Sequence, residues 1–274
     1  MLIDSHIHFW NYDKVRDAWI TEEMQVLQKN YLPQILQPVI QRADVDGVIA
    51  VQADQSEAET NFLLRLSQNN SFIKGVVGWI DLSSDRVEER LAYYQQFPQI
   101  KGWRHIVQAE PDNFMLGDKF QKGISLLQKY NYTYDILSYP HQIKTAIELV
   151  RTFPNQKFVL DHCAKPILKE KKIGDWKNQM QTIAENKNVY CKLSGLLTEA
   201  KWNQWQPEDF YPYLDIVFEA FGTERILFGS DWPVILLSGE YRQWKNLVEF
   251  YLQKFSTSEQ QNVMGNNAIK FYNL

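Results

Sequence analysis

Residues 2–9 read Leu-Ile-Asp-Ser-His-Ile-His-Phe, an apolar stretch with an acid and two histidines at every second position. Successive side chains of a strand point to opposite faces, so Asp4, His6 and His8 share one face. Two imidazoles in this arrangement suit a metal ion or a charged transition state, whereas the alternative is a pair of hydrogen-bonded core histidines. A second acid near the other end of the chain, in residues 228–233 (Phe-Gly-Ser-Asp-Trp-Pro), favours the functional interpretation.

Short apolar runs of this kind recur along the chain, and each is followed by a stretch with helical periodicity. The eight runs are residues 2–9, 47–52, 73–80, 100–107, 132–137, 157–162, 188–193 and 226–231. The amphipathic segments are residues 56–68, 86–96, 120–129, 142–152, 176–186, 207–221, 241–255 and 258–272. Strands that alternate with helices predict a parallel sheet, and eight such units predict closure into a barrel. We expect an α/β fold, a single (β/α)₈ TIM barrel over residues 1–274, with extended βα loops over its C-terminal face.

Composition limits the partners and the compartment. The length of 274 residues is close to the roughly 250 of a typical barrel, and 45% hydrophobic residues are ordinary for a globular protein. A net charge of −4 gives no reason to expect nucleic acid or an anionic membrane as partner. No apolar run approaches the roughly 18 residues that span a bilayer, and no signal peptide is evident. Cys163 and Cys191 lack a CxxC spacing, which indicates reduced thiols and a cytoplasmic protein.

Polar residues gather where the predicted strands end. All five histidines of the chain lie at such ends, and none lies in a predicted helix; they are His6, His8, His105, His141 and His162. In a barrel of this kind the active site lies at the C-terminal ends of several strands. The distribution therefore predicts a catalytic site at that face.

Six motifs resemble the amidohydrolase superfamily and, within it, the branch of sugar lactonases that open L-fuconolactone and L-rhamnonolactone. They are Asp-Ser-His-Ile-His-Phe-Trp (4–10), Gly-Trp-Ile-Asp-Leu (78–82), Lys-Gly-Trp-Arg-His (101–105), Asp-His-Cys-Ala-Lys-Pro (161–166), Cys-Lys-Leu-Ser-Gly-Leu (191–196) and Gly-Ser-Asp-Trp-Pro-Val (229–234). The similarity runs from residue 2 to about residue 272. The resemblance implies a (β/α)₈ barrel and hydrolysis of a cyclic ester, usually an aldonic acid lactone.

Opening a lactone needs an activated water, a polarised carbonyl and a proton for the departing alkoxide. A carboxylate at the mouth of a barrel can act as the general base, and the resemblance places this acid at Asp231. The alternative for Asp231 is a cap on the helix that follows. We expect His6, His8 and His162 to bind the water, a metal or the developing oxyanion.

Further residues are predicted to contact the substrate: Arg104, His105, Trp10, Trp232 and Asp81. The planar fork of Arg104 suits paired oxygens, unless Arg104 only pairs with an acid such as Asp81 or Asp135. The faces of Trp10 and Trp232 suit a sugar ring, although tryptophans also serve as packing. His105 is either a substrate contact or a partner of another site residue.

The sequence is compatible both with a bound metal ion and with a site that has none. Zinc-binding members of the superfamily place His-x-His on the first strand, histidines on the fifth and sixth, and Asp on the eighth. His6, His8, His162 and Asp231 match this pattern, but residues 132–137 contain no histidine, and His141 lies beyond the strand. One divalent ion, zinc before others, and metal-free hydrolysis are both compatible with these residues.

Further hypotheses concern the role of the loops and alternative functions of the protein. Residues 11–31 are predicted to form a lid, with residues 196–207 as a second candidate. A zinc-dependent decarboxylase or a hydrolase of a non-sugar lactone is the main alternative, and the missing histidine of the fifth strand argues against the decarboxylase. A third hypothesis is a non-catalytic protein that binds a sugar acid. The presence of a general base argues against it, because a binding protein does not need one. No oligomeric state is predicted.

Overall fold

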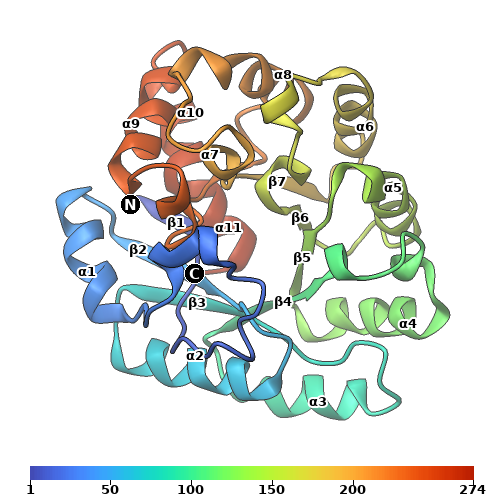
Figure 1. The fold of residues 1–274 in the computed structure, drawn as a ribbon. Coiled ribbons are helices and arrows are strands. Elements are labelled where there is room, and N and C mark those ends of the chain that lie inside the picture. Colours follow the sequence, from blue (N-terminus) through green and yellow to red (C-terminus); the bar gives the residue numbers. More distant parts are fainter.

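Eight parallel strands form one sheet in chain order in the computed structural model, which describes residues 1–274 (Figure 1). The strands are β1 Ile3–Ile7, β2 Gly47–Val51, β3 Ile73–Gly78, β4 Ile100–Ile106, β5 Thr133–Leu137, β6 Phe158–Leu160, β7 Val189–Leu193 and β8 Ile226–Phe228. A parallel bridge between Ile7 and Trp232 joins the first strand to the segment after the last. The backbone N–H of Asp231 also donates to the carbonyl of His6 at 2.9 Å. The predicted (β/α)₈ barrel is confirmed.

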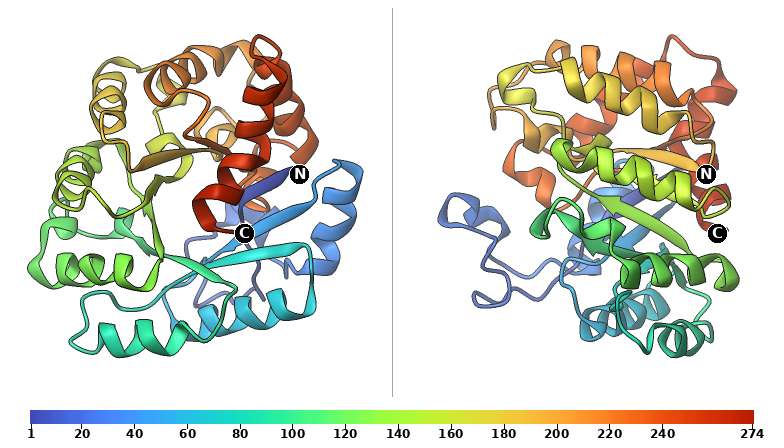
Figure 2. Two further views of the ribbon diagram at one scale, coloured as in Figure 1. Left: turned by 180° about the vertical axis from the view of Figure 1, so that it is seen from behind. Right: turned by 90° about the vertical axis from the view of Figure 1, so that its right-hand side faces the viewer.

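Helices surround the strands, as the predicted amphipathic segments require (Figure 2). They are α1 Pro33–Arg42, α2 Glu57–Asn69, α3 Val87–Tyr94, α4 Asp118–Leu127, α5 Ile143–Thr152, α6 Gly174–Ala184, α7 Leu196–Glu199, α8 Tyr211–Phe221, α9 Tyr241–Leu252, α10 Thr257–Gln261 and α11 Asn267–Tyr272. In α5 the buried residues Ile143, Ala146, Ile147 and Val150 follow the helical period, so one face of this helix packs on the barrel. No helix combines the length and the apolar character that a membrane crossing needs.

Several strands end earlier than the apolar runs predicted, and two of these ends shape the site. The run 157–162 forms a strand only to Leu160, and the run 226–231 only to Phe228. Beyond these ends the backbone of His162 (φ 53°) and Asp231 (φ 61°) adopts the left-handed region, which interrupts strand pairing. Both side chains are therefore presented from turns rather than from strands.

The interior of the barrel changes character along its axis. At the N-terminal end, apolar side chains such as Ile49, Val77 and Leu227 form a core cluster with Phe271 and Tyr272 of α11. This helix lies across that end of the barrel in the left view of Figure 2. The charged interior residues lie nearer the other end, so the fold places the polar site at the C-terminal face.

The longest βα loop, residues 11–31, projects from the barrel as the blue segment in the right view of Figure 2. Its two ends are joined because Trp10 and Tyr31 exchange backbone hydrogen bonds of 3.0 and 2.9 Å. The 3₁₀ helix Glu22–Leu27 lies within it. The role of this loop as a lid stays a prediction.

Candidate active site

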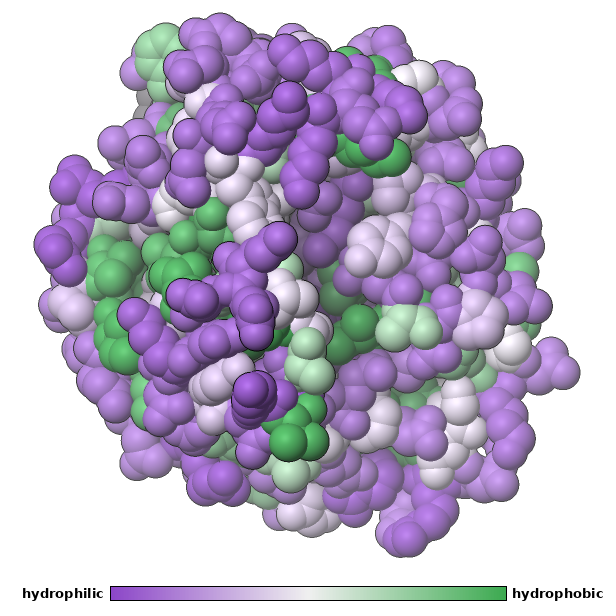
Figure 3. Space-filling model, in the orientation of Figure 1, coloured by the Kyte–Doolittle hydropathy of each residue, from purple (hydrophilic) through white to green (hydrophobic).

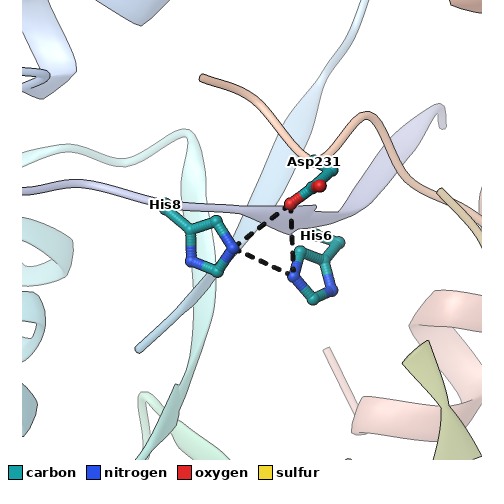
Figure 4. Close-up of side chains that lie close together, drawn as sticks. All are labelled: His6, His8 and Asp231. Atoms are coloured by element: carbon teal, nitrogen blue, oxygen red, sulfur yellow. Dashed lines mark hydrogen bonds and ion pairs between the residues drawn. The ribbon is translucent and has the colours of Figure 1, made fainter. Parts of the chain in front are cut away.

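His6, His8 and Asp231 meet at the C-terminal end of the barrel (Figure 4). The strand β1 supplies His6, the residue after β1 supplies His8, and the turn after β8 supplies Asp231. Nε2 of His6 and Nε2 of His8 lie 3.1 Å apart. Oδ1 of Asp231 lies 3.3 Å from Nε2 of His8 and 3.8 Å from Nε2 of His6. The alternation along β1 therefore brings both imidazoles to one carboxylate, as the sequence predicted.

The partners of the two imidazoles define where their protons lie. Nδ1 of His8 is 2.8 Å from the carbonyl oxygen of Val51, which can only accept, so Nδ1 carries the proton. Nε2 of His6 lies 3.3 Å from Nη1 of Arg104, and Nδ1 of His6 lies 3.3 Å from Asp161 and 3.2 Å from Nζ of Lys192. Nε2 of His8 then has a free electron pair, whereas both nitrogens of His6 face a donor. Two imidazole nitrogens and a carboxylate oxygen face one another at the end of the barrel, and such a set of groups can bind a divalent cation.

The separations also fit such an ion. Zinc binds nitrogen and carboxylate oxygen at about 2.0–2.2 Å, which places tetrahedral ligand atoms roughly 3.3 Å apart. The three ligand atoms of His6, His8 and Asp231 lie close to this spacing. A second cluster combines His6 with Asp161 and His162. In that cluster, however, the protein's own cations already pair with the carboxylate of Asp161.

Burial keeps His6 and His162 in their neutral form. Desolvation lowers the pKa of His6 well below its usual value and lowers the pKa of His162 to about 4. Desolvation alone would raise the pKa of Asp231, but the neighbouring imidazoles of His162, His8 and His6 hold it well below its usual range. Near neutral pH His6 and His162 are thus neutral imidazoles, and Asp231 is an ionised carboxylate. These forms bind metal ions and accept protons.

His162 reaches the site from an unusual turn. The four residues His162 to Lys165 have φ values of 53°, 51°, 54° and 50°, which non-glycine residues rarely adopt. The indole of Trp176 donates to the carbonyl of Cys163 at 2.8 Å and holds this turn. Nδ1 of His162 lies 2.8 Å from Oγ of Ser194, and Nε2 lies 3.9 Å from Oδ1 of Asp231. The turn therefore directs His162 toward the same carboxylate.

A network of buried charges lies beside His6. We call Arg104, Asp135, Asp161 and Lys192 the interior network. Nζ of Lys192 lies 2.5 Å from Oδ2 of Asp135 and 3.0 Å from Oδ1 of Asp161, and Nη1 of Arg104 lies 3.0 Å from Oδ2 of Asp161. All four side chains are buried, and two cations balance two carboxylates. Arg104 thus has an acidic partner, but this partner is Asp161 rather than Asp81 or Asp135.

A cavity of about 660 Å³ opens above the histidines, and Figure 3 shows the hollow near the centre of this face. Among the predicted site residues, those that line it are His8, Trp10, Arg104, His162 and Asp231. Other residues that line it are Trp19 and Met24 of the 11–31 loop, Gln55, Gln108, Tyr139, Lys165, Lys169, Glu199 and Trp202. Four of these lie in the two segments predicted as lids, 11–31 and 196–207. These lining residues share one feature of the sequence that could indicate a role in the site: all of them lie in segments that follow strand ends.

Three of the predicted substrate contacts lie outside the lining of this cavity. His105 pairs with Glu110 at 2.9 Å, because it follows Arg104 and points to the other face of β4. Trp232 is 2% exposed and packs against Tyr31 with ring centroids 5.2 Å apart. Asp81 is exposed in the turn after β3, where its carboxylate accepts from the backbone of Ser83.

Comparisons of the sequence with known proteins identify related proteins. The amidohydrolase family profile matches residues 3–274. An L-fucono-1,5-lactonase of Burkholderia multivorans is 36% identical, over 99% of this chain and 96% of that protein. An L-fucono-1,5-lactonase of Burkholderia ambifaria is 30% identical, over 99% of this chain and 95% of its own length.

A solved structure supports the same assignment. The crystal structure of an amidohydrolase from Burkholderia multivorans with bound zinc superposes with a TM-score of 0.96 at 36% identity, and the match covers 100% of this chain and 99% of that chain. Both the sequence and the whole barrel are therefore shared, and this chain belongs to the amidohydrolase family.

Proposed function

We propose that this protein hydrolyses an aldonic acid lactone by attack of water on the ester carbonyl of the ring. The observation that carries the proposal is the convergence of His6, His8 and Asp231 beneath a cavity of about 660 Å³. This volume suits a single sugar ring, and its lining mixes aromatic faces with polar groups. The two lactonase relatives, which span nearly the whole chain, support a six-membered 1,5-lactone as substrate.

Within this proposal, His6, His8 and Asp231 hold one divalent cation. The close approach of the two imidazole nitrogens to each other and to Asp231 supports this assignment, and the zinc in the related Burkholderia structure supports zinc as the ion. A divalent ion supplies Lewis acidity to the ester carbonyl and to the attacking water.

The side chains supply the proton transfers. Asp231, which is ionised near neutral pH, accepts a proton from the attacking water and returns it to the ring oxygen as the ester bond breaks. If Oγ of Ser194 donates to Nδ1 of His162, the proton of that neutral imidazole lies on Nε2, which then donates to the developing oxyanion. The guanidinium of Arg104 is held by Asp161 and adds positive charge beside the same atoms.

The test is a pH-indicator assay of the purified protein on a panel of sugar lactones with five- and six-membered rings. We expect acid release from L-fucono-1,5-lactone, or a close stereoisomer, far above the spontaneous rate. We also expect about one divalent ion per chain by elemental analysis and loss of activity on treatment with a chelator. Failure to open any lactone of the panel would contradict the proposal, and release of carbon dioxide from an aromatic acid would favour a decarboxylase.

A further inference from the structure

A second charged pair lies in the wall of the cavity, away from the histidines. Lys165 ends the left-handed turn after β6, and Glu199 ends α7 just after β7. Both residues line the cavity. Nζ of Lys165 lies 3.6 Å from Oε1 of Glu199, and the two side chains are 22% and 25% exposed. We call these two residues the wall pair.

The wall pair differs from an ordinary salt bridge because neither charged group forms a hydrogen bond. A separation of 3.6 Å is too long for a hydrogen bond between an ammonium and a carboxylate. No hydrogen bond ties either charged group to another part of the chain. Burial also raises the pKa of Glu199 above its usual value, which indicates that water solvates this carboxylate poorly. A donor and an acceptor are thus held side by side without close partners.

One aromatic ring lies beside the wall pair, and a second lines the same cavity. The ring of Tyr139 lies 6.0 Å from Nζ of Lys165, and the ring of Trp202 lies 5.4 Å from Nζ of Lys169. The indole of Trp202 is fixed because it donates to the carbonyl of Thr198 at 3.0 Å. Flat rings beside a charged donor and a charged acceptor suit a ring that carries several hydroxyl groups.

The same segments also position His162, which we propose to act in catalysis. His162 and Lys165 share one turn, and Ser194, which contacts His162, lies two residues before the short helix that ends in Glu199. A ring whose ester carbonyl meets His162 therefore places its other carbons along the wall that carries Lys165 and Glu199.

We propose that Lys165 and Glu199 bind neighbouring hydroxyl groups of the sugar ring, and that they select a polyhydroxylated lactone over an unsubstituted one. The ammonium of Lys165 donates to one hydroxyl oxygen, and the carboxylate of Glu199 accepts from the other hydroxyl. This inference rests on the proposed function, because the hydroxyl groups belong to the lactone whose ester lies at Asp231.

The first experiment compares two substrates, L-fucono-1,5-lactone and δ-valerolactone, which has the same ring without hydroxyl groups. For Lys165→Met and Glu199→Leu we expect KM for the sugar lactone to rise about 10- to 100-fold, because a hydrogen bond to a charged group is lost. We expect kcat/KM for δ-valerolactone to change less than about threefold, since it makes no such bond. Glu199→Gln keeps an acceptor oxygen and should recover part of the loss. Lys172→Met, an exposed lysine of the same βα loop, is the matched control.

Equal losses on both lactones, or no loss on either, would overturn the inference. Binding of the corresponding lactams, followed by tryptophan fluorescence, separates this inference from the proposed function. If no lactone is hydrolysed but the hydroxylated lactam binds and Glu199→Leu weakens it, the wall pair stands and the proposed function fails. If the sugar lactone is hydrolysed with unchanged KM in both variants, the proposed function stands and the wall pair fails. If neither hydrolysis nor hydroxyl-dependent binding occurs, both fail.

Discussion

The interior network and the wall pair hold their charges in opposite ways. Lys192 is completely buried and contacts Asp135 and Asp161 at 2.5 and 3.0 Å. Lys165 and Glu199 remain about one quarter exposed and stand 3.6 Å apart. Buried charges are tolerated only when they are closely paired, so the charged groups of the interior network contact mainly one another, and of the four only Arg104 lines the cavity. The wall pair keeps its donors and acceptors free.

The difference follows the architecture of the barrel. The interior network stands on β4, β5 and β7 and on the residue that follows β6, whereas the wall pair stands on segments beyond the strand ends. Through its contact with Nδ1 of His6 at 3.3 Å, Asp161 orients an imidazole before any substrate arrives. We infer that the strands and the residues directly after them position the reacting groups, and that the βα loops farther from the strands select the substrate.

The largest effect is expected at Asp231, the carboxylate that we propose as the general base. In Asp231→Asn the amide can neither accept the proton of the attacking water nor supply a negative ligand. We expect kcat to fall about 10³-fold or more, with the fold unchanged. The measurement is lactone hydrolysis followed by pH indicator, with Asp85→Asn, an exposed carboxylate, as control. Activity within tenfold of the unmodified protein would contradict the assignment of Asp231.

The second-largest effect is expected on protein stability, when a charge of the interior network is removed. Lys192→Met leaves Asp135 and Asp161 buried with one cation fewer, which should lower the free energy of unfolding by about 3–5 kcal/mol. Lys165→Met removes a lysine of the wall pair and should cost less than about 1 kcal/mol. Urea unfolding of the two variants measures both values. Equal losses would show that the two regions do not differ as we describe.

The sequence was sufficient for the barrel and for the centre of the site. Apolar runs and amphipathic segments predicted all eight strands, because in a parallel barrel each strand is buried on both faces. Alternation along β1 placed His6 and His8 together, and the position of Asp231 after the eighth run brought it to the same end.

The turn after β6 could not be predicted, because its cause is not local. The residues from His162 to Lys165 include no glycine or asparagine, the usual signals of a left-handed backbone. Contacts with distant residues hold the turn, among them the bond from Cys163 to the carbonyl of Lys192 at 3.3 Å and the indole of Trp176. For the same reason the partner of Arg104 was not foreseen: Lys192 already occupies Asp135, and Asp81 lies in an exposed turn.

Gly195 tests how closely the site depends on this turn. Its φ is +68°, and a Cβ there would lie 2.6 Å from Nδ1 of His162. In Gly195→Ala we expect kcat/KM to fall about tenfold, because His162 must move away from Ser194. Gly222 has a similar φ of +63°, but nothing lies within 4 Å of the added Cβ. Gly222→Ala should therefore lower stability by about 1 kcal/mol without changing activity, and equal activities of the two variants would remove the role given to His162.

Glu59 offers the smallest and most direct test of why the interior charges need partners. This carboxylate on α2 is 6% exposed, forms no salt bridge and accepts only from the backbone N–H of Ala53 at 3.3 Å. Burial raises its pKa to about 7, from a usual value of 4.5. Between these two pH values the folded protein binds more protons here than the unfolded chain, so stability falls as the pH rises toward 7 and stays lower above it.

Glu59→Gln keeps the shape and the acceptor oxygen but carries no charge at any pH. We expect this variant to be more stable than the unmodified protein by about 1–3 kcal/mol at pH 8, because only the unmodified protein must bury a charge there. At pH 5 the glutamate is protonated in the folded state, and the difference should nearly vanish. Thermal unfolding at the two pH values measures it as a shift of a few degrees at pH 8. A shift of the same size at both pH values would mean that a change in packing, and not the loss of an unpaired buried charge, stabilises the variant. Glu59 would then not differ from the paired carboxylates of the interior network in the way described.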